Sequence, residues 1–360
     1  MMHVVFDKEI LMSAIQPAMS AVSTKSTSTA AEGIKITAQK DGDCIINSFD
    51  MDKGIICRIK GDVEIEGSYI INGQKLSQMI RNMPGSITID VNEKCQAKIT
   101  SENSRFTVSA LPGDEFPNMP ALEGDWGFVI EEWQLKDMLN KTLHAVAVSD
   151  PRPALNGIFF QIQNNQMTMV SSDSFRLAIA QKKTTVKNLT EGELNQKVIV
   201  PAKTATELMK MIGDTTDEIT VLATRKHIIF KKENLCFFSR LIDAEYIEYR
   251  KFLSKNITST VTLKKEEFLE SLERASLVTE DRSLGQAKSY VKCSFDGNVL
   301  SVSSDSTSSS IYDQITMQNS CEKMEIGFHC RYLLDALRAA DTEYINISLV
   351  SPSLRFSLNR

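Results

Sequence analysis

The sequence has no Cys-x-x-Cys pair, although it contains seven cysteines. An odd number of cysteines, placed mostly among apolar residues, is typical of small buried side chains rather than of a disulfide framework or a zinc site. We therefore expect neither disulfides nor a bound metal. A reducing cytoplasm suits such a chain.

Long apolar runs are also missing. No run approaches the roughly 18 residues that a membrane-spanning helix needs, and no signal-peptide core precedes Phe6. We expect a cytoplasmic protein without a membrane partner. The net charge of −5 excludes a basic field over the whole surface, so contact with a polyanion would need a locally basic surface.

Motifs for catalysis are absent as well. The chain has no GxGxxG, GxxxxGK[ST], HExxH or GxSxG pattern, and its four histidines have no Cys or carboxylate neighbours at ligand spacing. The acids Asp50 and Asp52 stand in a turn, where solvated carboxylates are commoner than a general acid–base pair. We expect no catalytic residue, no metal site and no cofactor.

A pattern that occurs three times is present. Each copy starts with apolar residues at helical spacing and later carries a Ser-x-Asp triplet after a turn. The helical stripes start at Leu11, Leu135 and Phe268, and the triplets end at Asp50, Asp173 and Asp305. The stripes are 124 and 133 residues apart, and the aspartates are 123 and 132 residues apart. Two features that share one period indicate a triplicated domain.

We place the three domains at residues 1–121, 127–253 and 258–360. Each contains a second, shorter helical stripe, which starts at Leu76, Ala205 or Cys330 and is followed by alternating strands. Each domain is thus two β-α-β-β-β units. Strands that follow one another through turns form antiparallel sheets, with the helices on one side, so the predicted class is α+β.

Two local predictions follow from residue type. Pro17 should kink or shorten the first helix, because proline cannot donate the backbone hydrogen bond and its ring crowds the preceding turn. The recurring aspartates of the Ser-x-Asp triplets should cap turns, with the carboxylate accepting local backbone N–H groups. A catalytic carboxylate would not need to occur in every copy.

Basic residues recur at corresponding places in the three copies. They lie on predicted helices or on the loops that follow the first helix of each copy: Lys25, Arg81, Lys136, Lys141, Arg152, Lys203, Lys210 and Arg282. For each helix alone, a solvated polar face is the simpler interpretation. Together, on helices that face one way, they would form a positive lining that meets DNA phosphates without recognising bases.

The order of several motifs resembles the bacterial replicative sliding clamps, the beta subunits of DNA polymerase III. These motifs are Arg105-Phe-Thr-Val108, Leu111-Pro-Gly-Asp-Glu-Phe-Pro117, Arg152-Pro-Ala-Leu-Asn-Gly157, Asp173-Ser-Phe-Arg-Leu177 and Tyr332-Leu-Leu-Asp335. The resemblance implies a head-to-tail homodimer whose helices line the inside of a ring and whose sheets lie outside. Such a ring encircles duplex DNA, is opened by a clamp loader and keeps the polymerase processive.

The resemblance also implies a pocket that takes a short apolar peptide of the polymerase alpha subunit, the clamp loader or other clamp-binding proteins. By position its wall is Leu155, Ser172, Ser174, Phe175, Arg176, Leu177, Ile247, Lys251, Phe252, His329, Tyr332 and Ser353. The family usually has Thr and Gly-His where this chain has Ser172 and Ser174-Phe175, and Pro where it has Ile247. The rim should therefore be bulkier and less polar.

The family's subunit interface joins an edge strand of the first domain to the first helix of the third. Here those positions hold Phe106 and Val108 on one side and Leu272, Leu277 and Val278 on the other. An exposed edge strand invites aggregation unless it is paired. The family also continues into one more strand after the position of Arg360, and that strand forms part of the peptide pocket.

Two other functions stay open from the residues. One is a loader-independent protein-interaction scaffold that has lost its DNA role, which is motivated by the family's additional strand after the position of Arg360. A native mass showing only monomer at micromolar concentration would favour it. An enzyme of an unrecognised type would be indicated by any metal- or nucleotide-dependent turnover.

Overall fold

The computed structural model describes residues 1–23, 28–163, 166–183, 186–190, 192–253, 257, 259–279, 290–306, 308–351 and 355–359. It divides into two compact units. Unit 1 holds residues 1–139, 149–169 and 181–245, and unit 2 holds residues 140–148, 170–180 and 246–360.

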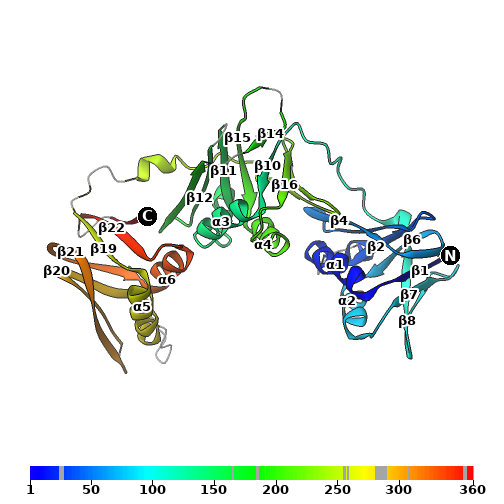
Figure 1. Ribbon diagram of the computed structural model, residues 1–360, viewed down its shortest axis with the longest axis horizontal. Coiled ribbons are helices and arrows are strands. Elements are labelled where there is room, and N and C mark those ends of the chain that lie inside the picture. Colours follow the sequence, from blue (N-terminus) through cyan, green and yellow to red (C-terminus); the bar gives the residue numbers. More distant parts are fainter. Residues whose placement is uncertain are drawn as a thin grey trace. The chain divides into compact units, whose positions relative to one another are not determined.

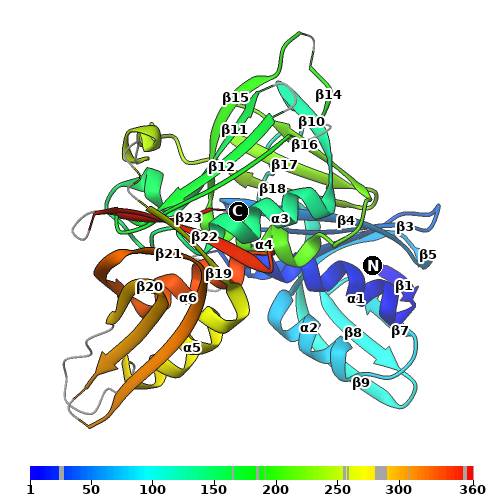
Figure 2. The ribbon, with the colours of Figure 1, turned by 60° about the vertical axis from the view of Figure 1, so that its left-hand side comes forward.

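The first third of the chain consists of two β-α-β-β-β units, with one additional short strand, β5, between them (Figure 1). Its elements are β1 (Met2–Phe6), α1 (Lys8–Ala18), β2 (Gly33–Ala38), β3 (Asp43–Phe49), β4 (Lys53–Lys60), β5 (Asp62–Ile65), β6 (Gly67–Asn72), α2 (Gly73–Asn82), β7 (Ile87–Val91), β8 (Gln96–Ser101) and β9 (Ser104–Pro112). Helices α1 and α2 lie side by side (Figure 2), with α1 against β3 and β4 and α2 against β2 and β6. Helix α1 ends one residue after Pro17 and passes into a short 3₁₀ turn, in line with the expected shortening.

The middle and last thirds repeat this order. The middle elements are β10 (Trp126–Glu131), α3 (Glu132–Leu143), β11 (Gly157–Gln163), β12 (Gln166–Ser172), β13 (Leu177–Lys183), β14 (Lys187–Asn188), β15 (Asn195–Pro201), α4 (Ala202–Met211), β16 (Glu218–Ala223), β17 (His227–Lys232) and β18 (Leu235–Arg240). The last are β19 (Ser259–Lys264), α5 (Lys265–Thr279), β20 (Tyr290–Asp305), β21 (Ser310–His329), α6 (Cys330–Ala339), β22 (Tyr344–Ser351) and β23 (Arg355–Asn359). In the last third, β20 and β21 are long strands, and each of them spans positions that form separate strands in the first third.

The predicted α+β class with antiparallel sheets is confirmed. Each residue-by-residue strand pairing recorded for the described residues is antiparallel. The helical stripes predicted from the sequence are mostly buried: Leu11, Leu135, Leu76, Leu208, Phe268 and Leu333 all lie in the core. Burying such a side chain contributes about 1.5–3 kcal/mol, which explains why periodicity located these helices.

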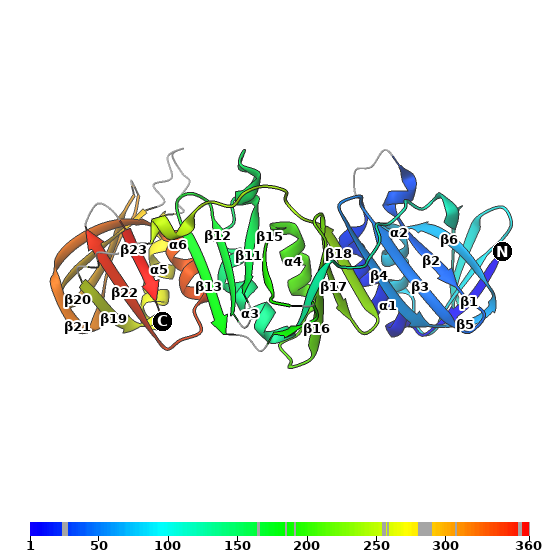
Figure 3. The same ribbon diagram turned by 90° about the horizontal axis from the view of Figure 1, so that it is seen from above.

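One sheet of unit 1 runs without interruption from the middle third into the first third. Strand β18 pairs with β4, and Figure 3 shows the two strands side by side. Phe238 stands opposite Gly54, and its ring lies 5.6 Å from that of Phe49. A Cβ on Gly54 would come within 2.3 Å of the Phe238 ring, so this close approach requires glycine.

Unit 2 has its own core. It is built from α5, α6 and strands β19 to β22, and Phe268, Leu272, Phe295, Leu333 and Ile347 are among its buried side chains. The cysteines agree with the expected small buried role: all seven are free thiols, and Cys44, Cys57, Cys293 and Cys330 are buried. Burial raises the pKa of Cys57 to about 12, which keeps this thiol protonated and unreactive.

Candidate functional site

The Ser-x-Asp triplets form the same turn in the first two copies. The Asp50 Oδ1 atom accepts the backbone N–H groups of Asp52 and Lys53, at 3.1 and 2.8 Å. The Lys53 ammonium group pairs with the other carboxylate oxygen. Upstream, the Ser48 hydroxyl donates to the carbonyl of Ala18, the last residue of α1. One triplet therefore caps a turn and holds the end of a helix.

The second copy repeats each of these contacts. The Asp173 Oδ1 atom accepts the N–H groups of Phe175 and Arg176, both at 3.0 Å, and Oδ2 pairs with Arg176 Nε at 3.0 Å. The Ser171 hydroxyl donates to the carbonyl of Thr142 at the end of α3. Residue Ser174 has a φ of 76°, matching the 79° of Met51 in the first copy. The expected capping role is confirmed for Asp50 and Asp173.

The turn of the third copy is described only in part. Asp305 remains in the β20–β21 ladder, where it faces Ser310. The Ser306 hydroxyl accepts the backbone N–H of Ser309 at 2.9 Å. Thr307, the first of the two residues whose N–H groups Asp305 would accept, lies outside the described residues, so the capping role of Asp305 stays a prediction.

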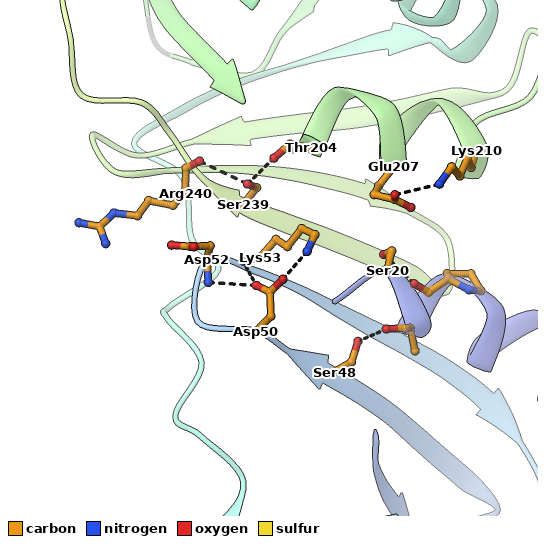
Figure 4. A network of polar contacts seen from close by, with 12 residues as sticks. Ser20, Ser48, Asp50, Asp52, Lys53, Thr204, Glu207, Lys210, Ser239 and Arg240 are labelled. Atoms are coloured by element: carbon orange, nitrogen blue, oxygen red, sulfur yellow. Dashed lines mark hydrogen bonds and ion pairs between the residues drawn. The ribbon is translucent and has the colours of Figure 1, made fainter. Parts of the chain in front are cut away.

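Figure 4 shows the polar contacts around the first turn, with Asp50 next to Lys53 and Ser239 next to Thr204. The carbonyl of Asp52 accepts the N–H of Arg240 at 2.8 Å, next to the paired strands β4 and β18. The Ser239 hydroxyl lies 2.6 Å from the Thr204 hydroxyl of α4. The bond from Arg240 to Asp52 connects the turn to the middle third within unit 1, whereas the contact between Ser239 and Thr204 lies within the middle third.

The second turn instead uses the Arg176 side chain, within unit 2. Its Nη1 atom donates to Asp335 Oδ2 of α6 at 2.8 Å, and Nη2 donates to the carbonyl of His144. The guanidinium carbon lies 4.2 Å from the centre of the Tyr332 ring, and that ring stacks on His329 at 4.2 Å. Arginine suits this position because its planar fork can bond two carboxylates while stacking on an aromatic face.

His144 completes this cluster. Burial lowers the pKa of its imidazole, the Arg176 charge lowers the pKa further, and Asp335 and Asp173 oppose the shift. No hydrogen-bond partner is recorded for its buried Nδ1 atom within the described part of the chain, and a backbone hydrogen bond with Asn140 also opposes the pKa shift. The sequence indicated neither His144 nor Asp335 as a site residue, although Asp335 stands three residues after Tyr332 on α6 and was part of a motif.

The residues predicted for the peptide pocket lie in several environments. Ser172 is buried at the end of β12, and its hydroxyl donates to the Arg176 carbonyl at 2.8 Å. Leu177, Ile247 and Tyr332 are half-buried. Leu155 is buried and belongs to unit 1, Lys251 pairs with Glu248, and Ser353 lies outside the described residues.

Two apolar side chains predicted for the peptide pocket, both in unit 2, are exposed. Phe175 is 84% exposed in the second turn, and Ser174 beside it is exposed too. Phe252 is 51% exposed and follows Lys251 in a 3₁₀ turn. Exposed phenylalanines of this kind are what a protein–protein contact requires.

Of the eight basic residues predicted to face DNA, six lie in the described part of the chain, and four of these pair with a carboxylate. Lys136 pairs with Asp214 at 2.8 Å, Lys141 with Asp341 at 3.0 Å, Arg152 with Asp150 at 2.9 Å and Lys210 with Glu207 at 2.8 Å. The Arg152 side chain, through its hydrogen bonds, lowers the pKa of Asp150 to about 2. Within the described part of the chain, no ion pair is recorded for Arg81 or Lys203. Lys25 and Arg282 lie outside the described residues.

The predicted subunit-interface residues also divide. Phe106 on β9 is 41% exposed, Val108 is half-buried, and Leu277 on α5 is 77% exposed. Leu272 is fully buried in the core of unit 2 and Val278 is buried, so neither side chain presents a surface to another subunit. For Leu272 the expectation was wrong, because it lies on the inward stripe of α5 with Phe268 and Ala275.

Other kinds of site find no support in the structure. Among the described residues, no three His, Cys, Asp or Glu side chains are grouped so that they could hold a metal ion. No helix of the described residues combines the length and the apolar character needed to cross a membrane.

The chain matches family models along nearly its whole length. The models are those of the DNA polymerase III beta subunit: its N-terminal domain over residues 2–120, its central domain over 129–248 and its C-terminal domain over 250–360. The beta sliding clamp of Halalkalibacterium halodurans is 29% identical, over 99% of this chain and 96% of the relative. That of Bacillus subtilis is 27% identical, over 96% and 93%.

Solved structures give the same result. A putative DNA polymerase III beta subunit from Eubacterium rectale superimposes with a TM-score of 0.91 at 26% identity, covering 100% of this chain and 96% of the other. The sliding clamp of Bacillus subtilis also superimposes with a TM-score of 0.91 at 26% identity, covering 99% and 95%. With three matching domain models and the same fold, this chain belongs to the bacterial beta sliding clamp family, the beta subunits of DNA polymerase III.

Proposed function

We propose that two copies of this chain join head to tail into a closed ring around duplex DNA and tether the replicative polymerase to it. The DNA polymerase III beta family to which the chain belongs and its beta sliding clamp relatives support a processivity factor. The observation that carries the ring is the internal pairing of β4 with β18, because it supplies a pattern for pairing between copies.

The pattern can be transferred through the repeats. The last pair before the turn is Ser101 with Ser104 in the β8–β9 hairpin and Lys232 with Leu235 in the β17–β18 hairpin. Phe106 and Phe237 each stand two residues after the second member of that pair, so they occupy corresponding positions. In β3–β4, Ser48 pairs with Ile55, and in β20–β21, Ser303 pairs with Tyr312, so Tyr312 corresponds to Ile55.

Phe237 and Ile55 stand opposite each other in the β4–β18 ladder. The equivalent contact therefore sets Phe106 of one copy opposite Tyr312 of the next, and Arg105 opposite Asp313. Phe106 and Tyr312 are 41% and 66% exposed, as unpaired partners would be. Between Ser310 and Ile315, β21 pairs only with β20 among the described strands. A contact between two different edges closes a ring when the rotation suits a small number of copies.

The polymerase and other partners would bind unit 2 beside the second turn. Phe175 and Phe252 are exposed, and Tyr332 presents an aromatic ring whose position Arg176 holds. A short apolar peptide would cover these rings and gain the free energy of their burial. The exposed Phe175 favours apolar over charged residues at the matching peptide position.

The ring is tested by retention on DNA. Loaded by a clamp loader onto a nicked circular duplex, the protein should remain bound, and it should be released once the circle is cut to a linear molecule. Equal retention on both forms would refute topological binding. In the same assay, Phe175→Glu should leave the ring on the circle but abolish stimulation of the polymerase; stimulation that survives would place the partner site elsewhere.

The proposed edge contact is tested by sedimentation equilibrium. Phe106→Ala should weaken the dimer by roughly 30-fold, because a central aromatic anchor typically contributes 2 kcal/mol or more. Ile65→Ala is a matched control: Ile65 lies on the edge strand β5 and is 43% exposed, close to the 41% of Phe106. Equal dissociation constants for the two variants would exclude β9 from the interface.

A further inference from the structure

The basic residues expected to meet DNA are largely neutralised by the chain itself, and this bears on how the protein would hold a duplex. Of the six that the structure describes, Lys136, Lys141, Arg152 and Lys210 each pair with a carboxylate 2.8–3.0 Å away. The partners Asp214 and Asp341 are far away in sequence, and Asp150 and Glu207 are local. Only Arg81 and Lys203 have no ion pair recorded within the described residues.

We infer that these intramolecular pairs keep the chain's direct affinity for duplex DNA low and only weakly dependent on salt. A cation already paired with a carboxylate adds little net charge to the field that a phosphate meets. Neutralising a phosphate with it would require breaking the existing pair, so few counterions are released from the DNA. This inference rests on the proposed function, because it assumes that these residues face the duplex.

The magnitude decides whether the effect can be measured. Binding to duplex DNA weakens with salt with a slope of about −0.9 per neutralised phosphate. Six available cations would give a slope of about −5 per chain, whereas Arg81 and Lys203 alone would give about −2. A shallow dependence of affinity on salt suits a closed ring that stays on DNA because it encircles the duplex. Strong contacts with phosphates would slow the movement of such a ring along DNA.

The test frees the cations without removing them. The variant Asp150→Asn/Glu207→Gln/Asp214→Asn raises the net charge by three and removes the carboxylates that pair with Arg152, Lys210 and Lys136. The control Asp62→Asn/Glu93→Gln/Glu123→Gln makes the same charge change at exposed positions that lie outside the helices. Binding to a labelled linear duplex of about 30 base pairs is measured by fluorescence anisotropy between about 25 and 200 mM NaCl, without a loader.

We expect the first variant to steepen the salt slope by about 2 to 3 and to bind about tenfold more tightly at low salt. The control should have the slope of the wild-type protein. Identical curves for the two variants, or a wild-type slope near −5, would overturn the inference. Thermal unfolding of both variants checks that each is folded.

A second pair of variants removes the charges. Arg81→Gln/Lys203→Gln should flatten the remaining slope, while Lys136→Gln/Lys210→Gln should leave it unchanged because these lysines are already paired; the reverse result would contradict the inference. The circle assay decides the ring separately. If retention on circles fails while the freed-cation variant still steepens the slope, the ring is refuted and the neutralised surface stands.

Discussion

The turns at residues 50–53 and 173–176 occupy the same place in two copies of one repeat and share their internal hydrogen bonds. They differ in what holds them to neighbouring elements. The first joins a continuous β-ladder to the middle third: Lys53 stands opposite Ser239, and the Asp52 carbonyl accepts the backbone N–H of Arg240. The second depends on one side chain, Arg176, which bonds Asp173, Asp335 and His144 and stacks on Tyr332.

This difference indicates which contacts of the repeated unit are kept when side chains are substituted. A backbone ladder tolerates many side chains, provided that a close approach such as that of Gly54 to Phe238 is kept. A side-chain cluster depends on a single residue type. The turn beside α6 can therefore be altered by one substitution, whereas the turn beside β18 cannot.

The largest expected effect comes from removing Arg176. Arg176→Ala should lower the free energy of unfolding by about 2 kcal/mol, because it removes charge-assisted hydrogen bonds and leaves Asp335 without its arginine partner. Lys53→Ala, the matched change in the first copy, should cost less than about 1 kcal/mol, since Asp50 keeps both of its backbone N–H donors. Chemical denaturation measures both values.

Arg176→Lys separates charge from geometry in the same comparison. Lysine keeps the positive charge but cannot bond Asp173, Asp335 and a carbonyl at once, so it should recover less than half of the loss. Hydrogen exchange in residues 140–148 and 330–338 should rise in both Arg176 variants and stay unchanged in Lys53→Ala. Equal losses for Arg176→Ala and Lys53→Ala would contradict the asymmetry between the two turns.

Much of the fold could be predicted because it depends on local periodicity. Apolar stripes at Leu11, Leu135 and Phe268 located helices whose inner faces are buried, and the Ser-x-Asp triplets located two capped turns. In the third copy the Ser306 hydroxyl accepts a backbone N–H of the turn, and the role of Asp305 stays a prediction because Thr307 lies outside the described residues. The error at Leu272 was avoidable, since its place on the stripe of α5 already indicated burial.

The charge pairing could not be predicted, for a physical reason. Lys136 and Asp214 are 78 residues apart, and Lys141 and Asp341 are 200 apart, so no spacing rule connects them. The contacts of Arg176 with Asp335 and His144 are likewise long-range and form only when α3, the second turn and α6 come together. Local patterns identify which residues are basic, and tertiary structure decides whether that charge is available.

The smallest expected effect concerns pH and again distinguishes the two turns. Because the pKa of His144 is lowered in the folded chain, the unfolded chain takes up the proton first as the pH falls below about 6.5. The contribution of neutral His144 is therefore complete above that pH and decreases as the pH falls towards the folded pKa. The corresponding position of the first copy holds Ser20, which does not titrate. The protection from hydrogen exchange, measured relative to the intrinsic exchange rate at each pH, should therefore decrease on acidification around residues 140–148 and not around residues 18–22.

His144→Gln should remove most of this acid-induced exchange, because glutamine carries no titrating proton. Arg176→Ala should raise the pKa of His144 in an NMR titration, since the Arg176 charge is one of the causes that lower it. His227→Gln is the control: burial, Arg240 and Lys226 also lower the pKa of His227, but this residue lies on β17 in unit 1. If His227→Gln suppressed the exchange at residues 140–148 as strongly as His144→Gln, the acid response would not originate at the second turn.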